Sequence, residues 1–587
     1  MKESKLEYKD SLIPLYLGIT GHRDIKDEDK DKLSQMITDF IESKKKQCPH
    51  TPVVFLTPLA EGADRIAALA AIKCGIDFIA VLPMPVEAYE RSFASNESSI
   101  EFEYLLGKAS RKIVLPLLEG VTISEVFENP KYRHEQYYQV GMFIVKYCHT
   151  LIALWDGNVN NKRGGTAEIV QSKRSGIPGK LGRTFERLQH LQTGPVYHIV
   201  TPRKNNPSPD NPFAIKVYYS VHFGDDEAEA KKHDCEILAH LDSLNKDITY
   251  FSISLKKRAI HSVERLFGNS SELKKDEILV TIANRRGIIR ELAMLYQTRR
   301  ILALRVLLFL VVIAFIFLQV YAEFYNNPAY LIMYPLIMGA GAIWYYLAKR
   351  NRFEHKHEDY RALAEAFRVQ FYMKVCGSND NVSDHYLKKH RGELEWVLYT
   401  VRSSELDIWT NDSSSQYIWT SEPAKAYLFL KENWIDEQLR YFNRNAEKHN
   451  RLNKKWELIA NWFFIGAIAS ACLLFLVNLN VEKIQGNTGH IQNTLHSVLL
   501  SLTHVSLIVA AILHGYSDKM IYGEQAKSYL QMAHLFNTAK MKLSLAIEVN
   551  DYAEAKEIIW ELAVEALLEN GDWLLLHRSR PMEMPKG

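Results

Sequence analysis

The sequence predicts an α/β domain with a Rossmann-like, doubly wound parallel sheet at the N-terminus, followed by an all-α membrane region with four transmembrane helices. Short apolar runs alternate with polar helical patterns over residues 1 to about 270, which is typical of a parallel sheet with helices on both faces. Four longer apolar segments follow, each close to the ~20 residues that cross a bilayer. Charged helical stretches flank these segments, which indicates two transmembrane hairpins accompanied by long cytoplasmic helices.

Six apolar runs are the candidate strands of the sheet. They are Leu15 to Thr20, Val53 to Leu56, Phe78 to Leu82, Lys112 to Leu117, Leu151 to Trp155 and Val196 to Thr201. Helical patterns fill the intervals between them, as in Tyr132 to Tyr147. In a sheet of this kind ligands bind at the carboxyl ends of the strands, so the loops at those ends are where a site is expected.

The four candidate spans are 303–322, 329–348, 458–479 and 495–513. The first three are apolar on all sides, whereas a buried core helix is usually shorter and carries polar residues along one face. The fourth span carries Ser501, Thr503, His504 and Ser506. No span has an acidic residue or a Lys in its middle, which argues against a transporter coupled to protons or ions.

Basic residues predict how the spans cross the membrane. Lys and Arg precede the first and third spans and follow the second and fourth, whereas the loop 323–328 has none and the loop 480–494 has only Lys483. The positive-inside rule then places the N-terminus, the middle segment and the C-terminus in the cytoplasm. We therefore expect a multi-pass protein of the plasma membrane.

The composition excludes several classes of protein. Of 587 residues, 47% are hydrophobic and 24% are charged, so the chain is neither disordered nor fibrous. Its 72 Lys and Arg residues exceed its 69 Asp and Glu residues by only three, which gives no overall basic field, and we expect no direct binding of nucleic acid. The 6 cysteines are widely spaced, without a CxxC pair or zinc-ligand spacing, which predicts reduced cysteines and no metal site.

The predicted organisation has five parts. The Rossmann-like domain covers 1–205, a helical linker 206–283, the first hairpin and its cytoplasmic stem 284–376, a connecting segment 377–433, and the second hairpin with C-terminal helices 434–587. The stretch Tyr360 to Arg368 has apolar residues at i, i+3, i+4 and i+7, so it is expected to pack on another helix. Oligomers also assemble through stems of this kind, and we expect a homo-oligomer.

Three loops at the carboxyl ends of the predicted strands have a composition that suits a nucleotide. In Gly18 to Asp24, glycine permits close approach of the backbone and Arg23 can pair with a phosphate. The acidic residues of Leu59 to Asp64 can bind ribose hydroxyls. The third loop runs from Trp155 to Glu168 and ends at the start of a helix, whose N–H groups suit an anion. The candidate ligand-binding residues are Thr20, Gly21, Arg23, Glu61, Gly62, Asp64, Asp156, Gly157, Gly164, Gly165, Thr166 and Glu168.

Each loop alone has a purely structural explanation, because glycine-rich turns and Thr or Asp helix caps are common. Three such loops at one edge of the sheet are a stronger indication of a binding site. Neither GxxxxGKS/T nor GxGxxG occurs in them, so a P-loop NTPase or a classical dehydrogenase is not supported.

The order GITGHRD, LAEGAD, ALWDG and GGTAE resembles the SLOG superfamily, the Rossmann-like group that includes the LOG nucleotide-processing enzymes. Those enzymes carry a PGGxGTxxE motif, and Gly165 to Glu168 resembles its GTxxE part with one residue fewer, while Asn158 to Arg163 lacks the Pro and the spaced glycine. The hairpins and the YRALAEAFR stem resemble the SLATT group of two-span proteins, and Glu569 to Pro581 is similar to their tail.

The resemblance implies a component of bacterial antiviral defence that acts by abortive infection. Its cytoplasmic domain would sense a nucleotide or cyclic nucleotide, and its hairpins would perturb the bacterial inner membrane. The ligand would be nucleotide-derived, with no other cofactor and no metal. In this scheme Thr20, Gly21 and Arg23 bind one phosphate, Glu61 and Asp64 bind ribose or base, Gly164, Gly165 and Thr166 bind a second phosphate, and Glu168 is either a helix-start residue or a vestigial catalytic acid.

Two other functions stay open at this point. A membrane-tethered nucleotide hydrolase, either a LOG-like N-glycosidase or an enzyme that processes NAD, needs Glu168, Glu61 or Asp64 as a general acid/base with a raised pKa. A scaffold or channel with an unliganded Rossmann-like head would bind no nucleotide. The partly kept GTxxE motif favours a ligand-gated effector over an enzyme.

Overall fold

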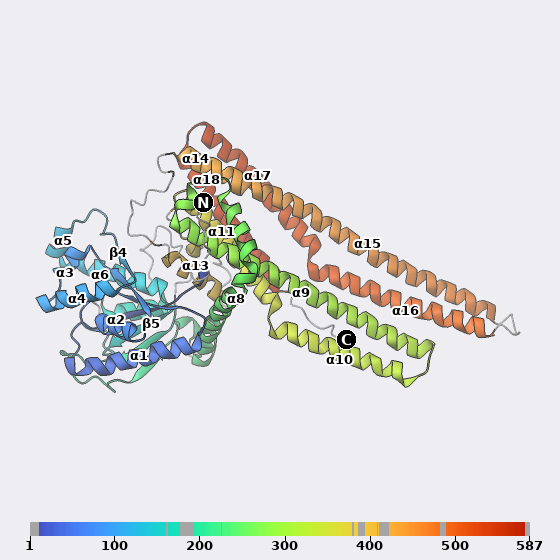
Figure 1. Cartoon of the computed structure of the whole chain (residues 1–587), viewed down its shortest axis with the longest axis horizontal. Coiled ribbons are helices and arrows are strands. Elements are labelled where there is room, and N and C mark those ends of the chain that lie inside the picture. The colour runs from blue at the N-terminus through green and yellow to red at the C-terminus, as the bar shows by residue number, and fades with distance from the viewer. Residues whose placement is uncertain are drawn as a thin grey trace.

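The computed structural model consists of an α/β head, a helical middle part, and four long helices that project away from the head (Figure 1). It describes residues 11–159, 162–176, 193–224, 226–378, 381–385, 394–407, 409, 419, 422–481 and 489–580. Lys483, parts of the connecting segment 377–433, and the last residue of the tail, Pro581, lie outside this description.

The head is built on a seven-stranded sheet of order β4-β3-β2-β1-β5-β6-β7. Its strands are β1 Leu15–Gly21, β2 Val53–Thr57, β3 Asp77–Leu82, β4 Arg111–Val114, β5 Thr150–Trp155, β6 Val196–Val200 and β7 Ile215–Tyr218. The first six run parallel, as predicted, and β7 pairs antiparallel with β6. The sequence pattern did not predict β7, because Lys216 interrupts its apolar residues and most of the strand is exposed.

Both faces of the sheet are covered, so the predicted doubly wound fold class is confirmed. Leu15, Leu17 and Ile19 of β1 belong to one apolar cluster and Tyr16 to another, as the two-residue period of a strand requires. Helices α1 and α2 contribute to the first cluster and α6 and α7 to the second. The helices of the head are α1 Lys30–Gln47, α2 Ala63–Lys73, α3 Val86–Glu90, α4 Asn96–Lys108, α5 Ile123–Glu128, α6 Pro130–Tyr147 and α7 Thr166–Ser175.

The rest of the described chain is helical. It comprises α8 Glu227–Phe267, α9 Glu277–Glu323, α10 Pro328–Arg350, α11 Phe353–Val375, α12 Val382–His385, α13 Glu395–Asp407, α14 Pro423–Leu430, α15 Asp436–Val481, α16 Gly489–Met520, α17 Tyr522–Glu548 and α18 Tyr552–Arg578. A π-helical turn, Lys431–Ile435, joins α14 to α15. Short 3-10 turns lie at Asp27–Asp29, Val221–Phe223 and Leu273–Lys275.

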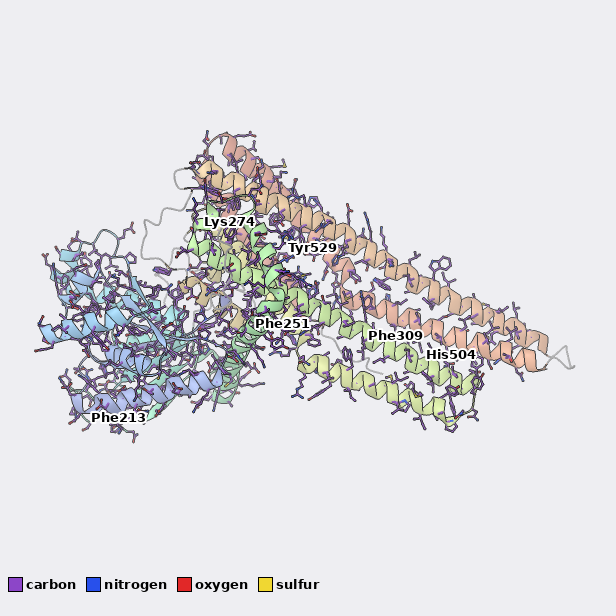
Figure 2. The ribbon with its side chains drawn as sticks, viewed as in Figure 1. Phe213, Phe251, Lys274, Phe309, His504 and Tyr529 are labelled. Atoms are coloured by element: carbon purple, nitrogen blue, oxygen red, sulfur yellow. The ribbon has the colours of Figure 1, made fainter. Side chains whose placement is uncertain are left out.

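Four of these helical stretches, which contain α9, α10, α15 and α16, are long and apolar enough to cross a membrane. Only 11–22% of the residues in their most apolar windows are buried within the protein. Their surface is therefore apolar and open to the surroundings, as a bilayer requires. Phe309 on α9 and His504 on α16 lie along this bundle (Figure 2).

The two hairpins share one plan. In each, a very long helix, α9 or α15, is followed by a second span, α10 or α16, and then by a stem helix, α11 or α17. The second span and the stem are separated by a residue in the left-handed region, Arg352 with φ 52° in the first copy and Ile521 with φ 54° in the second. This conformation costs a non-glycine residue about 1 kcal/mol, so its recurrence marks the same bend in both copies.

The stem α11 packs on two other helices, as its periodicity predicted. Ala362, Leu363 and Phe367 are completely buried, and α11 contacts α9 and α18. The amide of Asn570 on α18 donates to the carbonyl of Ala362 at 3.0 Å, and the guanidinium of Arg361 lies 3.7 Å from the ring centre of Trp573. Helix α18 thus holds the stem α11 in place.

The loop between α9 and α10 and the start of the third span should lie on opposite sides of the membrane. In a background with the exposed Cys235 and Cys472 replaced by Ser, we expect Asn326→Cys to react with a membrane-impermeant maleimide in intact cells. Lys455→Cys should react only after the cells are opened, because the positive-inside rule places it in the cytoplasm. Equal labelling of both variants in intact cells would contradict this topology.

Candidate functional site

The order of the sheet reverses between β1 and β5, and this point is where ligands bind in doubly wound sheets. The two strands run parallel, with Thr20 opposite Ala153 and Gly21 opposite Leu154. At their carboxyl ends the N–H of His22 donates to the carbonyl of Leu154 at 3.1 Å. The loops that follow β1 and β5 therefore meet directly above the reversal point.

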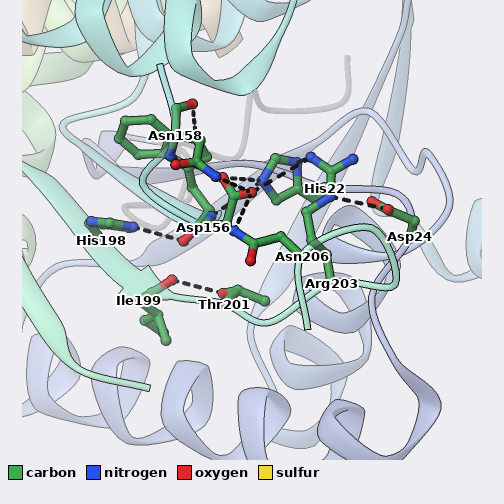
Figure 3. A network of polar contacts seen from close by, with 10 residues as sticks. His22, Asp24, Asp156, Asn158, His198, Ile199, Thr201, Arg203 and Asn206 are labelled. Carbon is green, nitrogen blue, oxygen red and sulfur yellow. Dashed lines mark hydrogen bonds and ion pairs between the residues drawn. The ribbon is translucent and has the colours of Figure 1, made fainter. Parts of the chain in front are cut away.

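A polar network ties these loops to the chain after β6 (Figure 3). Nε2 of His22 lies 3.1 Å from a carboxylate oxygen of Asp156, and its Nδ1 lies 3.3 Å from the guanidinium of Arg203. Arg203 also pairs with Asp24 at 3.1 Å. The amide of Asn206 donates to Asp156 at 3.2 Å. Strands β1, β5 and β6 are thereby joined through side chains at one edge.

The network contains one neutral ring and one ionised carboxylate. Burial and the charge of Arg203 lower the pKa of His22, against the opposing influence of Asp156, so the imidazole is neutral at pH 7. Burial acts to raise the pKa of Asp156, but hydrogen bonds from Asn158, Asn206 and His22 bring it below its ordinary value. Asp156 consequently serves as an anionic anchor for the two loops.

Arg23 lies on the other side of the β1 loop, next to α6. Its guanidinium is 4.9 Å from the ring centre of Tyr137, and the side chain is exposed. The carboxyl group of Asp64 and the hydroxyls of Tyr89 and Tyr137 also interact electrostatically with it. The edge of the sheet therefore offers an accessible cation beside one aromatic ring, which is suitable for a phosphate beside a base.

Asp64 is the most strongly perturbed carboxyl group of the three predicted loops. It lies in the first turn of α2, is 6% exposed, and accepts the N–H of Ala60 at 3.2 Å. Burial raises its pKa to about 7, although the charges of Arg23 and Arg65 and the N–H of Ala60 act in the opposite direction. At neutral pH the group is therefore close to half protonated.

Glu61 and Gly62 shape the second loop. A carboxylate oxygen of Glu61 accepts the N–H of Ala94 at 3.0 Å and the hydroxyl of Ser98 at 2.5 Å. Burial acts to raise the pKa of Glu61, yet these hydrogen bonds and the charges of Arg65 and Arg23 bring it below its ordinary value. Gly62 has φ 80°, and a Cβ there would lie 2.5 Å from the carbonyl oxygens of His22 and Arg23. Only glycine permits this contact between the first two loops.

Glu168 closes the third loop onto the start of α7. One of its oxygens accepts the N–H of Gly164 at 2.7 Å, and the other pairs with Arg163 at 2.7 Å. Arg163 also pairs with Glu135 on α6 and lies over the ring of Tyr138. The carboxylate thus occupies the first turn of α7, where the positive end of the helix dipole favours an anion.

Some of the predicted residues lie at the reversal point, and others lie at the starts of α7 and α4. Thr20, Gly21, Arg23, Gly62 and Asp64 belong to loops in direct contact, and Asp156 and Gly157 join them through the β5 loop. Gly164, Gly165, Thr166 and Glu168 form the start of α7, which packs on α6, the helix that also carries Tyr137. Glu61 is directed toward the start of α4.

Sequence reasoning missed several residues of this edge, namely His22, Tyr89, Arg203 and Asn206. Arg203 and Asn206 follow β6, so the rule that identified the other loops also applies to them. His22 stands inside the first predicted loop, but nothing in the spacing indicated its pairing with Asp156 across more than a hundred residues. Among the residues that the structure describes, no group of three or more His, Cys, Asp or Glu side chains is arranged to hold a metal ion.

Comparison with protein-family models, with curated proteins and with solved structures finds no match to this chain. The structural facts are therefore a mostly parallel α/β head with a polar site at its reversal point, and four long apolar helices.

Gly21 permits the close approach of β1 to α2, because a Cβ there would lie 2.4 Å from Cβ of Ala63 and 2.8 Å from the carbonyl of Leu154. We expect Gly21→Ala to destabilise the head by about 1–3 kcal/mol and to lower its melting temperature. Gly107→Ala is the control, since a Cβ there meets nothing within 4 Å and alanine favours a helix. An equal effect of the two substitutions would contradict the proposed close packing.

Asp64 should make the stability of the protein depend on pH. Its pKa is raised from 3.8 to about 7 in the folded state. The folded state is therefore favoured most below about pH 4, where the carboxyl is neutral, and this contribution to the free energy of unfolding is lost as the pH rises to 7. The loss amounts to roughly 4 kcal/mol. Between pH 4 and pH 8 the melting temperature should therefore fall less steeply for Asp64→Asn than for wild type. Asp210→Asn, at an exposed position, should leave the slope unchanged.

Proposed function

We propose that this protein is a nucleotide-gated membrane effector, in which a nucleotide bound at the reversal point of the head changes the arrangement of the apolar helices. The observation that carries the proposal is a direct connection between the sheet and the first long helix. The carboxylate of Asp407, at the end of α13, accepts the hydroxyl of Tyr16 on β1 and pairs with Arg285 on α9 at 2.5 Å. Tyr16 precedes the candidate site on the same strand.

The connection extends across the sheet. Arg111 on β4 donates to the backbone carbonyls of Leu406 and Asp407 at 2.7 and 2.6 Å, and the N–H of Tyr16 donates to the hydroxyl of Tyr399 at 2.9 Å. The C-terminal end of α13 is therefore held both by two strands of the sheet and by α9. A shift of β1 relative to β4 changes the position of α13 and, through Arg285, of α9.

A second connection runs through α8. Asn245 is completely buried. Its side chain both accepts the N–H of Ile13 and donates to the carbonyl of Ile13, each at 2.9 Å. It also donates to the hydroxyl of Thr51 at 3.1 Å. Because α8 packs along α9, the starts of β1 and β2 are fixed to the same helix that enters the apolar bundle.

The chemistry of the site supports a nucleotide as the signal. Arg23 supplies an accessible cation beside the ring of Tyr137, and the start of α7 supplies N–H groups that lack acceptors within the helix. A ligand shifts the equilibrium only by its different affinity for two states. Displacement of Glu168 from the start of α7 by a phosphate is one such difference, since it would remove one of the two carboxylates that pair with Arg163.

The resemblance to SLOG and SLATT proteins points to the same kind of effector. In this proposal the protein lies in the bacterial inner membrane with both termini in the cytoplasm, binds a nucleotide or cyclic nucleotide made during infection, and assembles as a homo-oligomer. Perturbation of the membrane by the two hairpins then arrests the infected cell.

One observation favours a nucleotide hydrolase as a second candidate. Asp64, with a pKa raised to about 7 and with Arg23 nearby, meets the requirement for a general acid/base at neutral pH. Of the other two candidates, Glu168 is engaged by Arg163 and by the N–H of Gly164, and Glu61 has a pKa below its ordinary value. Recovery of a bound nucleotide in cleaved form, abolished by Asp64→Asn, would replace the sensor by this enzyme.

The gating proposal is tested with the full chain in liposomes that contain a dye. A panel of cyclic dinucleotides, ADP-ribose and its cyclic forms, and nucleoside monophosphates is added, and binding and dye release are measured separately. We expect one nucleotide to release dye from wild-type liposomes. Asp407→Asn should bind it within about threefold of wild type and release dye at least tenfold more slowly, because the ion pair with Arg285 is lost.

Two controls accompany that experiment. Asp27→Asn removes an exposed carboxylate that pairs with Lys30 and should behave as wild type. Arg23→Ala should lose nucleotide binding, whereas Lys46→Ala, which removes an exposed cation in the last turn of α1, should retain it. Unimpaired dye release by Asp407→Asn would refute the coupling, and failure of every panel member to bind would favour a scaffold without a nucleotide ligand.

A further inference from the structure

A cleft lies between the two hairpins, at one end of the apolar bundle. It is lined by Arg305, Leu308, Phe309 and Val312 of α9, by Trp456 of α15, and by Val509, Ile512, Leu513 and Tyr516 of α16. Phe309 marks its place on α9 in Figure 2. Further along the bundle α9 and α16 converge, and Nδ1 of His504 lies 3.2 Å from the side-chain oxygen of Gln319. The cleft therefore belongs to one half of the bundle.

The polar residues of the cleft lie together at the boundary of the apolar segments. Arg305 stands near the start of the first span, Trp456 just before the third, and Tyr516 just after the fourth. The rings of Trp456 and Tyr516 are 5.2 Å apart, edge to face, and the charge of Arg305 acts on the hydroxyl of Tyr516. In the proposed topology this end of the bundle faces the cytoplasm.

The polar side chains of the cleft contact one another beside an exposed cation. The hydroxyl of Tyr516 interacts with Arg305 and with Tyr522, and the indole of Trp456 interacts with Tyr522. Tyr516 is only 5% exposed, whereas Arg305 is exposed. Arg305 is therefore the polar group of the cleft that an acceptor from outside the chain can reach.

The other six lining residues are apolar and lead from the polar end into the bundle. Leu308, Phe309 and Val312 form one wall, and Val509, Ile512 and Leu513 form the other. Phe309 is 63% exposed, so this surface is left uncovered by the protein itself. An exposed cation above an apolar channel matches a phosphate ester attached to a hydrocarbon chain.

We propose that the cleft binds one anionic phospholipid of the cytoplasmic leaflet. Its phosphate pairs with Arg305 beside the rings of Trp456 and Tyr516, and one acyl chain lies between α9 and α16. The charge complementarity favours a lipid over a helix of a second copy, because the apolar spans carry no acidic residue in their middle to pair with Arg305. The inference rests on the proposed membrane location. It implies that the lipid composition of the membrane affects how the two hairpins pack against each other.

The test uses the full chain, purified in detergent and stripped of lipid, with phosphatidylglycerol and phosphatidylcholine of identical acyl chains as probes. Retained lipid is counted by native mass spectrometry. We expect wild type to bind phosphatidylglycerol more tightly than phosphatidylcholine. Arg305→Gln should weaken phosphatidylglycerol binding roughly fivefold, the effect of one cation near an anionic headgroup, and Arg305→Lys should restore most of it.

Arg350→Gln is the matched control. Arg350 is an exposed cation at the C-terminal end of α10, the end that returns toward Arg305, and it does not line the cleft. It should bind phosphatidylglycerol as wild type does. Val509→Trp leaves every charge in place but fills the channel, so it should reduce binding of both lipids. Equal binding of the two lipids by wild type, or equal losses for Arg305→Gln and Arg350→Gln, would overturn the proposal.

Failure of the lipid site is distinguishable from failure of the proposed function. Extraction of the protein from membranes by carbonate would refute the membrane location itself. A protein that stays in the membrane and binds nucleotide, but shows no preference for phosphatidylglycerol, would lose only the lipid site. Binding of a second copy in place of the lipid would show as a change of oligomeric mass for Val509→Trp.

Discussion

The carboxylate of Asp407 is the interaction on which the relation between the head and the apolar bundle depends. It joins Tyr16 on β1 to Arg285 on α9, while Arg111 on β4 holds the backbone beside it. A charge placed between a sheet and a helix is stable only while both partners stay in position, because a partly buried ion that loses its partner is costly. The contact therefore stabilises the arrangement of the head and α9 in which Tyr16 and Arg285 both reach Asp407.

Helix α9 is long enough to connect this contact to the apolar bundle. One helix of 47 residues runs from Glu277, beside the head, through Arg285 to the end of the first apolar segment at Glu323. A helix transmits displacement along its axis because each turn is hydrogen-bonded to the next. The stem α11, fastened by α18, packs against the same helix, and the second hairpin repeats the plan with its own bend at Ile521. The head thus contacts the long helix of one hairpin directly, and the cleft at Arg305 lies where that hairpin meets the other.

The sequence was sufficient for the elements whose signal is local. The parallel strands other than β4 are largely buried apolar runs. The spans are long apolar segments, and the loops that carry Arg23 and Asp64 follow strands at one edge of the sheet. β7 was missed because an exposed edge strand with Lys216 in its middle has no apolar run. The contact of Tyr16 with Asp407 spans 391 positions, and no spacing rule reaches across that distance. The pKa of Asp64 likewise follows from burial, which depends on tertiary packing.

Hydrogen–deuterium exchange of the full chain in lipid nanodiscs, with and without each nucleotide of the panel, tests the central claim most directly. We predict that one nucleotide slows exchange in the loops around His22, Asp64 and Asp156 and also changes exchange at two distant places, the end of α13 near Asp407 and the part of α9 around Arg285. Protection confined to the head loops would contradict the coupling, because a ligand would then bind at the reversal point without acting on the helix that enters the membrane. No change with any nucleotide would contradict the binding site itself.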